Sequence, residues 1–137
     1  YRDLADEAGV LERILFLGPQ KNLTTVYQAA DVLAHPTLED TYGMVVLEAM
    51  AHGLPVVVSG LPFCGISSEL VHGVQALILQ DPTNAQALAQ ALLTLVDQPE
   101  VMQNLSSQGH AWATQKTWSQ CAQVHEAVFA QVTARKG

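Results

Sequence analysis

Residues 34–60 read AHPTLEDTYGMVVLEAMAHGLPVVVSG, and this stretch decides the fold of the chain. Its order predicts the end of a strand, a loop, an apolar helix over about 42–52 and a further strand over 56–58. Two carboxylates bracket the start of that helix, because Asp40 lies in the loop and Glu48 lies inside the helix. The stretch is typical of a protein in which strands and helices alternate.

The sequence on both sides continues this alternation. Further strands are predicted at 13–17, 32–34 and 75–79, and further helices at 2–9, 22–30, about 67–71, 84–97, 99–115 and 117–134. Most of these strands are apolar on both faces, which is typical of a parallel sheet covered by helices. The predicted fold class is therefore α/β, a Rossmann-like parallel sheet with flanking helices, in one domain with a helical tail over about 84–134.

Composition and charge narrow the range of functions. Hydrophobic residues make up 49% of the 137 residues and charged residues 14%, which indicates a globular chain. Thirteen acidic residues against six basic ones give a net charge of −7, which argues against binding to nucleic acids or anionic membranes. The two cysteines, Cys64 and Cys121, have no metal-type spacing and indicate a reducing, cytoplasmic compartment. The apolar runs are too short to span a membrane.

The start of helix 42–52 is a candidate anion site. In an open parallel sheet, ligands bind beyond the carboxyl ends of the strands, and the loop 35–41 follows such an end. The helix presents free backbone N–H groups and a partial positive charge at its start. Gly43 lets a ligand approach that backbone closely. A helix start of this kind binds phosphate through the backbone, although the feature is too common to identify a ligand by itself.

The two carboxylates make the predicted ligand more specific. At about 1.5 Å per helical residue, Asp40 and Glu48 lie roughly 12 Å apart along the helix axis. An acid and a base that act on one bond need carboxylates about 5–9 Å apart, so this pair suits a longer ligand with an anionic middle, such as a nucleotide sugar. Glu48 also lies among apolar residues. Either a lysine, an arginine or a hydroxyl group pairs with it, or it lies on an exposed stripe of the helix.

The stretch DTYGMVVLEAMAHGLPVV over 40–57 resembles the Glu-x7-Glu region of the retaining glycosyltransferases of family 4. FLG at 16–18 and YQAADV at 27–32 are similar to neighbouring elements of that family, and the resemblance extends over about 10–97. The resemblance implies the GT-B fold, in which two Rossmann-like domains enclose the active site between them.

Within that fold, residues 1–137 would be most of the C-terminal, donor-binding domain, and the N-terminal acceptor domain would lie outside the chain. The start Tyr-Arg-Asp-Leu has neither a Met nor a signal-like segment, so we expect a piece of a longer or processed protein. The family's donor domain begins with two more strands, whose basic residues grip the diphosphate; the basic residues here match none of those positions. We therefore predict that 13–17 and 32–34 pair directly, or that exposed sheet edges drive dimerisation.

The resemblance also implies roles for individual residues. Glu48 would hold the ribose hydroxyls of the donor. Asp40 stands where the family has its first Glu, which touches the donor sugar; Asp is shorter by one methylene, and the adjacent Glu39 is the less favoured alternative. His35 is a candidate contact to the base or ribose. The backbone N–H groups expected to meet the diphosphate and sugar belong to Tyr42, Gly43, Met44 and Val45.

Two further segments are interpreted in the same way. Residues 63–69 resemble the family segment that lines the donor site and opens the next short helix, and the Cys-Gly pair within it is similar to lipopolysaccharide core glucosyltransferases. Glu69 is expected to favour the start of that short helix. Trp112 and Trp118 are expected to pack the helical tail, whose last helix would cross to the other domain.

The implied reaction is transfer of a hexosyl group, with retention, from a nucleotide diphosphate sugar to a glycan, lipopolysaccharide or other glycoconjugate. UDP is favoured over GDP, the nucleotide sugar is a substrate rather than a cofactor, and no spacing predicts a metal site. The implied location is the cytoplasm, with the inner face of the membrane as a peripheral alternative, and the fragment alone would be inactive. Two alternative function classes are a catalytically inactive glycosyltransferase-like binding module and a receiver domain. A receiver domain needs an acid pair and a late lysine, and this sequence lacks both.

Overall fold

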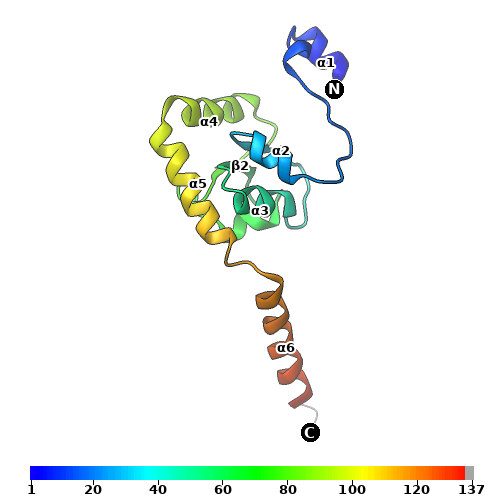
Figure 1. Ribbon diagram of the computed structural model, residues 1–137, viewed down its shortest axis with the longest axis vertical. Coiled ribbons are helices and arrows are strands. Elements are labelled where there is room, and N and C mark those ends of the chain that lie inside the picture. Colours follow the sequence, from blue (N-terminus) through cyan, green and yellow to red (C-terminus); the bar gives the residue numbers. More distant parts are fainter. Residues whose placement is uncertain (135–137) are drawn as a thin grey trace.

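The computed structural model describes residues 1–134 and shows an α/β fold built on a parallel sheet (Figure 1). The three strands, in the order β1-β2-β3 across the sheet, are β1 (Leu33–His35), β2 (Val56–Ser59) and β3 (Leu77–Leu79). The predicted fold class is confirmed.

Six α-helices and two 3-10 turns are described around the sheet. In chain order they are α1 (Arg2–Glu7), η1 (Leu11–Arg13), α2 (Thr24–Ala29), α3 (Met44–Ala51), η2 (Gly65–Glu69), α4 (Ala85–Asp97), α5 (Pro99–Ala113) and α6 (Trp118–Ala134). Helix α3 packs against β1, β2 and α5, and helix α4 packs against β2, β3 and α5. None of the helices described is both long and apolar enough to cross a membrane.

Strand β2 is the centre of the core, and all four of its residues are buried. Successive side chains of a strand point to opposite faces of the sheet. Val56 and Val58 accordingly join a core cluster that includes the buried side chains of α3, whereas Val57 joins a second cluster with Leu95 of α4 and Leu105 of α5. This two-sided burial explains why the strand is apolar throughout.

The helical tail follows the sequence prediction to within about two residues. Asn84 is the N-cap of α4, because its side-chain oxygen accepts a hydrogen bond of 3.0 Å from the Ala87 N–H. Pro99 is the first residue of α5, where its missing N–H costs nothing. Thr117 caps α6, since its hydroxyl accepts from the Gln120 N–H at 3.2 Å.

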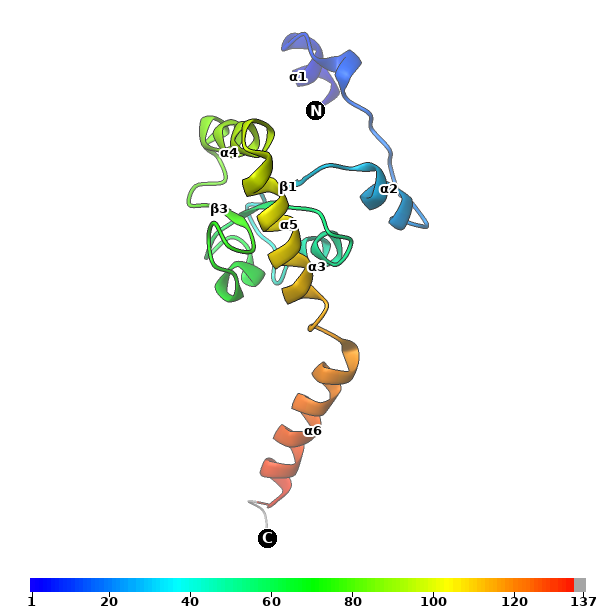
Figure 2. The same cartoon turned by 60° about the vertical axis from the view of Figure 1, so that its left-hand side comes forward.

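The prediction of a strand at 13–17 is wrong. Residues 14–17 are irregular backbone after η1, with Leu15 80% exposed and Leu17 47% exposed. Figures 1 and 2 show α1 and this segment as an arm that extends away from the sheet. Among residues 1–134, β1 pairs only with β2, so the predicted direct pairing of 13–17 with 32–34 is also wrong. A strand is held by its neighbours, and the described residues supply none here; dimerisation through exposed edges stays a prediction.

Helix α6 also stands apart from the body, as both views show (Figures 1 and 2). None of its residues is buried. Trp112, on α5, is half-buried against the core as predicted, and Lys116 Nζ lies 4.7 Å from the centre of its ring. The expectation for Trp118 is wrong, because its side chain is 82% exposed at the start of a helix that has no partner within the described chain.

Candidate functional site

The candidate site is built around the start of α3, where Gly43 has φ +97° and ψ 51°. A Cβ at this position would lie 2.8 Å from Cys64 Sγ and 3.1 Å from Ile66 Cγ2. Both the left-handed backbone and the close packing therefore require glycine. The residue provides more than room for a ligand, because it lets the loop 63–66 pack directly beneath the helix start.

Three backbone N–H groups at this helix start have no acceptor among the described residues: those of Gly43, Met44 and Val45. The next N–H, of Val46, donates to the Gly43 carbonyl at 2.9 Å. The Tyr42 N–H, predicted to meet the ligand, instead donates to Asp40 Oδ1 at 3.2 Å. The structure thus leaves three of the four predicted donors available for an anion.

Helix α3 is apolar along most of its length, as predicted, but only one side of it is buried. Val46, Ala49 and Met50 are buried against the sheet and α5, but Met44 and Glu48 are exposed. The described elements cover one side of the helix and leave the other open. Met44 and Glu48, two of the candidate ligand residues, lie on the open side.

Glu48 has a hydroxyl partner, which was one of the alternatives that the sequence left open. The hydroxyl of Tyr27 on α2 donates to Glu48 Oε2 at 2.9 Å, and Tyr27 itself is only 7% exposed. Burial, together with the hydrogen bond and charge of Glu48, raises the pKa of Tyr27 to about 12. The hydrogen bond holds Oε2, and Oε1 accepts no hydrogen bond from the described residues.

Asp40 is fixed through both its backbone and its side chain. Its N–H donates to the Phe63 carbonyl at 2.9 Å, and its carbonyl accepts from the Gly65 N–H at 3.2 Å. Its Oδ2 lies 3.0 Å from His35 Nε2, and the two side chains are 29% and 23% exposed. His35, proposed from sequence as a contact to the base or ribose, thus contacts the carboxylate assigned to the sugar.

The loop after β2 brings a cysteine to the same place. Cys64 is buried, and its thiol lies 3.6 Å from the Tyr42 carbonyl, to which it donates. Burial raises the pKa of this thiol, and the charge of Asp40 adds to the effect. Sulfur, imidazole nitrogen and carboxylate oxygen of Cys64, His35 and Asp40 all lie within 4.8 Å of one another. No sequence spacing signalled this cluster, because the loop of His35 and Asp40 meets the loop of Cys64 only in the tertiary structure.

Glu69 does not have its predicted role at a helix start, because it is the last residue of η2. It accepts hydrogen bonds from Lys116 at 2.5 Å and from the Tyr42 hydroxyl at 3.2 Å. The hydrogen bond from Lys116 is the main cause that lowers the pKa of Glu69. Lys116 is therefore paired with a carboxylate, and it lines the same cavity as Tyr42 and Met44.

An open cavity of about 610 Å³ lies between α3 and α6. Tyr42, Met44 and Leu47 line it from one side, and Trp118 and Val124 of α6 line it from the other. The cavity is continuous with the open side of α3, so the start of α3 is accessible from this direction.

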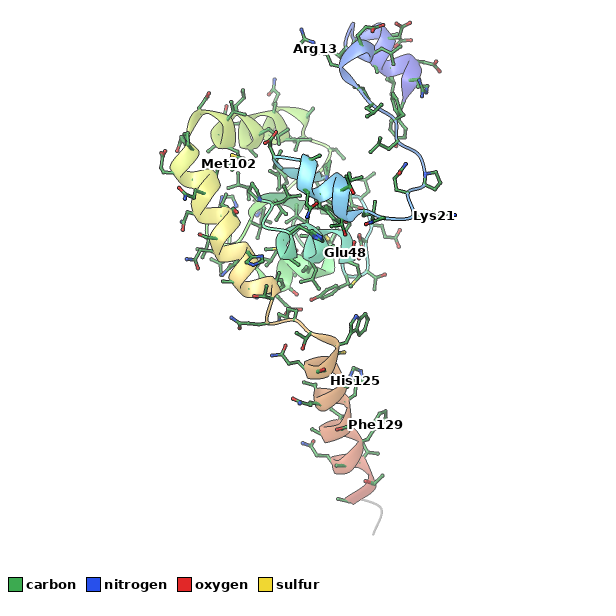
Figure 3. The ribbon with its side chains drawn as sticks, in the orientation of Figure 1. Arg13, Lys21, Glu48, Met102, His125 and Phe129 are labelled. Carbon is green, nitrogen blue, oxygen red and sulfur yellow. The ribbon has the colours of Figure 1, made fainter. Side chains whose placement is uncertain are left out.

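Basic side chains are scarce around the site within the described chain. Figure 3 shows Arg13 and Lys21 on the N-terminal arm, away from Glu48, and Arg2 lies over the ring of Phe16 on the same arm, 4.5 Å from its centre. Lys116 lines the cavity beside α3 but is paired with Glu69, so the partial positive charge of α3 is the unpaired electrostatic attraction that the described residues offer at the helix start.

Comparison with known proteins identifies relatives. The sequence profile of the family described as Glycosyl transferases group 1 matches residues 1–98. D-inositol 3-phosphate glycosyltransferase of Corynebacterium glutamicum (strain R) is 35% identical over 127 residues, which cover 89% of this chain and 29% of that protein. The chain spans less than a third of the length of the curated relatives that it matches most strongly.

Solved structures with the same fold include sucrose-phosphate synthase from Thermosynechococcus elongatus, with a TM-score of 0.85 and 26% identity over 97% of this chain and 33% of that one. Anabaena HepE, solved in complex with UDP-glucose, has a TM-score of 0.82 and 26% identity over 93% of this chain and 35% of that one.

Proposed function

The chain belongs to the group 1 glycosyltransferases, the retaining family 4 with the GT-B fold, and on this premise we propose that it forms the donor-binding half of a glycosyltransferase active site. Residues 1–137 would be the C-terminal, donor-binding domain, and the acceptor would be bound by a domain outside this chain. The substrate would be a nucleotide diphosphate sugar, with the sugar passed to a glycan or another glycoconjugate.

The observation that carries this proposal is the row of groups along the start of α3. Three unbonded N–H groups lie between two carboxylates, each of which is held in place by a neighbouring side chain. A diphosphate at the N–H groups would place a ribose toward Glu48 and a sugar toward Asp40. UDP-glucose in the Anabaena neighbour supports a UDP-sugar as the donor.

In this arrangement the chain acts mainly on the leaving group. As the bond between the sugar and the diphosphate breaks, negative charge grows on the diphosphate. The N–H groups and the partial positive charge of α3 would stabilise that charge without any reorganisation. Further positive charge would come from residues outside the described chain, because Lys116 at this cavity is paired with Glu69 and Arg2, Arg13 and Lys21 lie on the N-terminal arm (Figure 3).

The roles of the two carboxylates are tested in the whole protein that carries this chain. Glu48→Gln should weaken UDP binding by roughly tenfold or more, because it alters a hydrogen-bonding charged group. Asp40→Asn should mainly lower kcat and leave UDP affinity nearly unchanged. Isothermal calorimetry with UDP-glucose and GDP-mannose, together with transfer kinetics, measures both effects.

Glu39→Gln is the matched control, because Glu39 is an exposed carboxylate beside Asp40. It should change neither binding nor kcat, and an effect as large as that of Asp40→Asn would move the sugar contact to Glu39. Negligible effects from both Asp40→Asn and Glu48→Gln would refute the assigned roles. A folded protein that binds no nucleotide sugar would support the alternative, an inactive binding module.

A further inference from the structure

Three side chains with different donor atoms meet at the carboxyl end of the sheet. His35 ends β1, Asp40 follows in the next loop, and Cys64 follows β2. Their imidazole nitrogen, carboxylate oxygen and sulfur lie within 4.8 Å of one another, and the His35 Nε2 to Asp40 Oδ2 distance is already 3.0 Å. We propose that His35, Asp40 and Cys64 form a site for a thiophilic divalent cation of the zinc type, and that an ion bound there withdraws Asp40 from the donor sugar.

The backbone holds these ligands in place before any ion binds. Asp40 and Cys64 form an isolated parallel bridge, in which the Phe63 carbonyl and the Gly65 N–H bond to the backbone of Asp40. The loop after His35 is tied to β2, because the Ser59 hydroxyl donates to the Thr37 carbonyl at 2.8 Å. Such fixed backbone lowers the cost of assembling a metal site.

The side chains are also oriented as ligands. The Tyr42 N–H donates to Asp40 Oδ1 and leaves Oδ2 directed at His35. Hydrogen bonds of this kind to the second oxygen orient carboxylates that bind metals. Cys64 is fully buried, whereas His35 and Asp40 keep some exposure, so an ion would enter from their side.

The mixed set of donors selects the class of ion. One sulfur, one nitrogen and one oxygen suit Zn²⁺ or Co²⁺, whereas Mg²⁺ and Ca²⁺ prefer oxygen alone. In a tetrahedral zinc site the ligand atoms lie roughly 3.3–3.6 Å apart, so the His35–Asp40 edge is close to that spacing, and the sulfur, within 4.8 Å of both, would have to move closer. The thiol proton would pass to solvent as the metal–sulfur bond forms. Thiolate and carboxylate would then balance the charge of the ion, with the fourth position open to water.

Competition with the donor follows from the shared carboxylate, and this part of the inference rests on the proposed function. Asp40 Oδ2 cannot bind an ion and a sugar hydroxyl freely at the same time. Zinc should therefore lower kcat, as Asp40→Asn is expected to do, and substitution of Cys64 should remove this sensitivity.

The first test uses the 137-residue chain with Co²⁺ as a spectroscopic probe. A Cys121→Ser background removes the exposed thiol, whose sulfur lies 3.7 Å from His125 Nδ1 and which offers a competing pair of ligands. In this background Co²⁺ should give the thiolate-to-metal absorption of a tetrahedral site. Zn²⁺ should displace it, and Mg²⁺ should not.

Variants then assign the ligands. Cys64→Ser should abolish the thiolate absorption, and His35→Gln should weaken Co²⁺ binding by at least about tenfold. His35 is partly exposed, so His35→Gln keeps the test decisive even if Cys64→Ser does not fold. The proposal is overturned if the Cys121→Ser chain shows no thiolate absorption, if the absorption persists in the folded Cys64→Ser chain, or if Mg²⁺ displaces Co²⁺ as readily as Zn²⁺ does.

The second test uses the whole protein and separates the two parts of the inference. Zinc should lower kcat for transfer from UDP-glucose in the Cys121→Ser protein and leave kcat unchanged in the Cys64→Ser, Cys121→Ser protein. A verified cobalt site without any zinc effect on kcat would overturn the competition for Asp40 and the assignment of Asp40 to the sugar, while the cation site itself would stand.

Discussion

Substitution of Gly43 by alanine tests whether the start of α3 depends on glycine. An alanine with φ +97° costs about 1–3 kcal/mol in backbone strain. Its Cβ would also lie 2.8 Å from Cys64 Sγ, and overpacking of this kind typically costs about 1–3 kcal/mol. Gly43→Ala should therefore lower the free energy of unfolding by about 2–6 kcal/mol, a large part of the roughly 5–15 kcal/mol of a typical domain.

Gly73→Ala is the matched control. Gly73 also has a positive φ, +76°, but a Cβ there would meet nothing within 4 Å. This variant should therefore show the backbone cost alone. Urea denaturation monitored by far-ultraviolet circular dichroism gives the loss of unfolding free energy in each variant. The loss in Gly43→Ala minus the loss in Gly73→Ala is the cost of the contact with the loop 63–66.

A double-mutant cycle with Cys64→Ala isolates the contact further. Removal of the sulfur should relieve part of the clash, so Gly43→Ala should cost less in the Cys64→Ala background than in the original chain. Equal destabilisation by Gly43→Ala and Gly73→Ala, with no coupling in the cycle, would refute the close packing of helix start and loop. The helix start would then owe its shape to the local backbone alone.

Two further predictions concern the core and its pH dependence. Because the pKa of Tyr27 is raised to about 12 in the folded chain, its contribution to stability is complete below its unfolded value near pH 10 and is lost as the pH rises toward 12. Tyr27→Phe should remove this loss, as urea denaturation at about pH 9 and about pH 11.5 would show; an identical loss in the variant would contradict the assignment. Leu105→Ala should cost about 2–5 kcal/mol because Leu105 is fully buried. Leu93→Ala, at a position 52% exposed, should cost less than about 1 kcal/mol in the same assay, and similar costs would contradict the described core.

The sequence alone determined the architecture and the family. Local signals were sufficient for the helical tail, because the caps at Asn84 and Thr117 and the proline at 99 lie within one turn of the helix boundaries that they set. The same holds for β2, whose buried run of valines reflects burial on both faces. The spacing of Asp40 and Glu48 around Gly43 was also visible, since it lies within one loop and one helix.

The tertiary structure alone decided which groups meet. The apolar residues 14–17 have a strand-like sequence but remain exposed. A strand forms only beside another strand that hydrogen-bonds to its backbone, and the sequence of the segment itself does not show whether such a neighbour is present. Tyr27 meets Glu48 across two helices, and Cys64 meets His35 and Asp40 across two loops. These contacts join residues far apart in the chain, so they depend on how the elements pack rather than on any local pattern. The start of α3 could be found from sequence, but its partners could not.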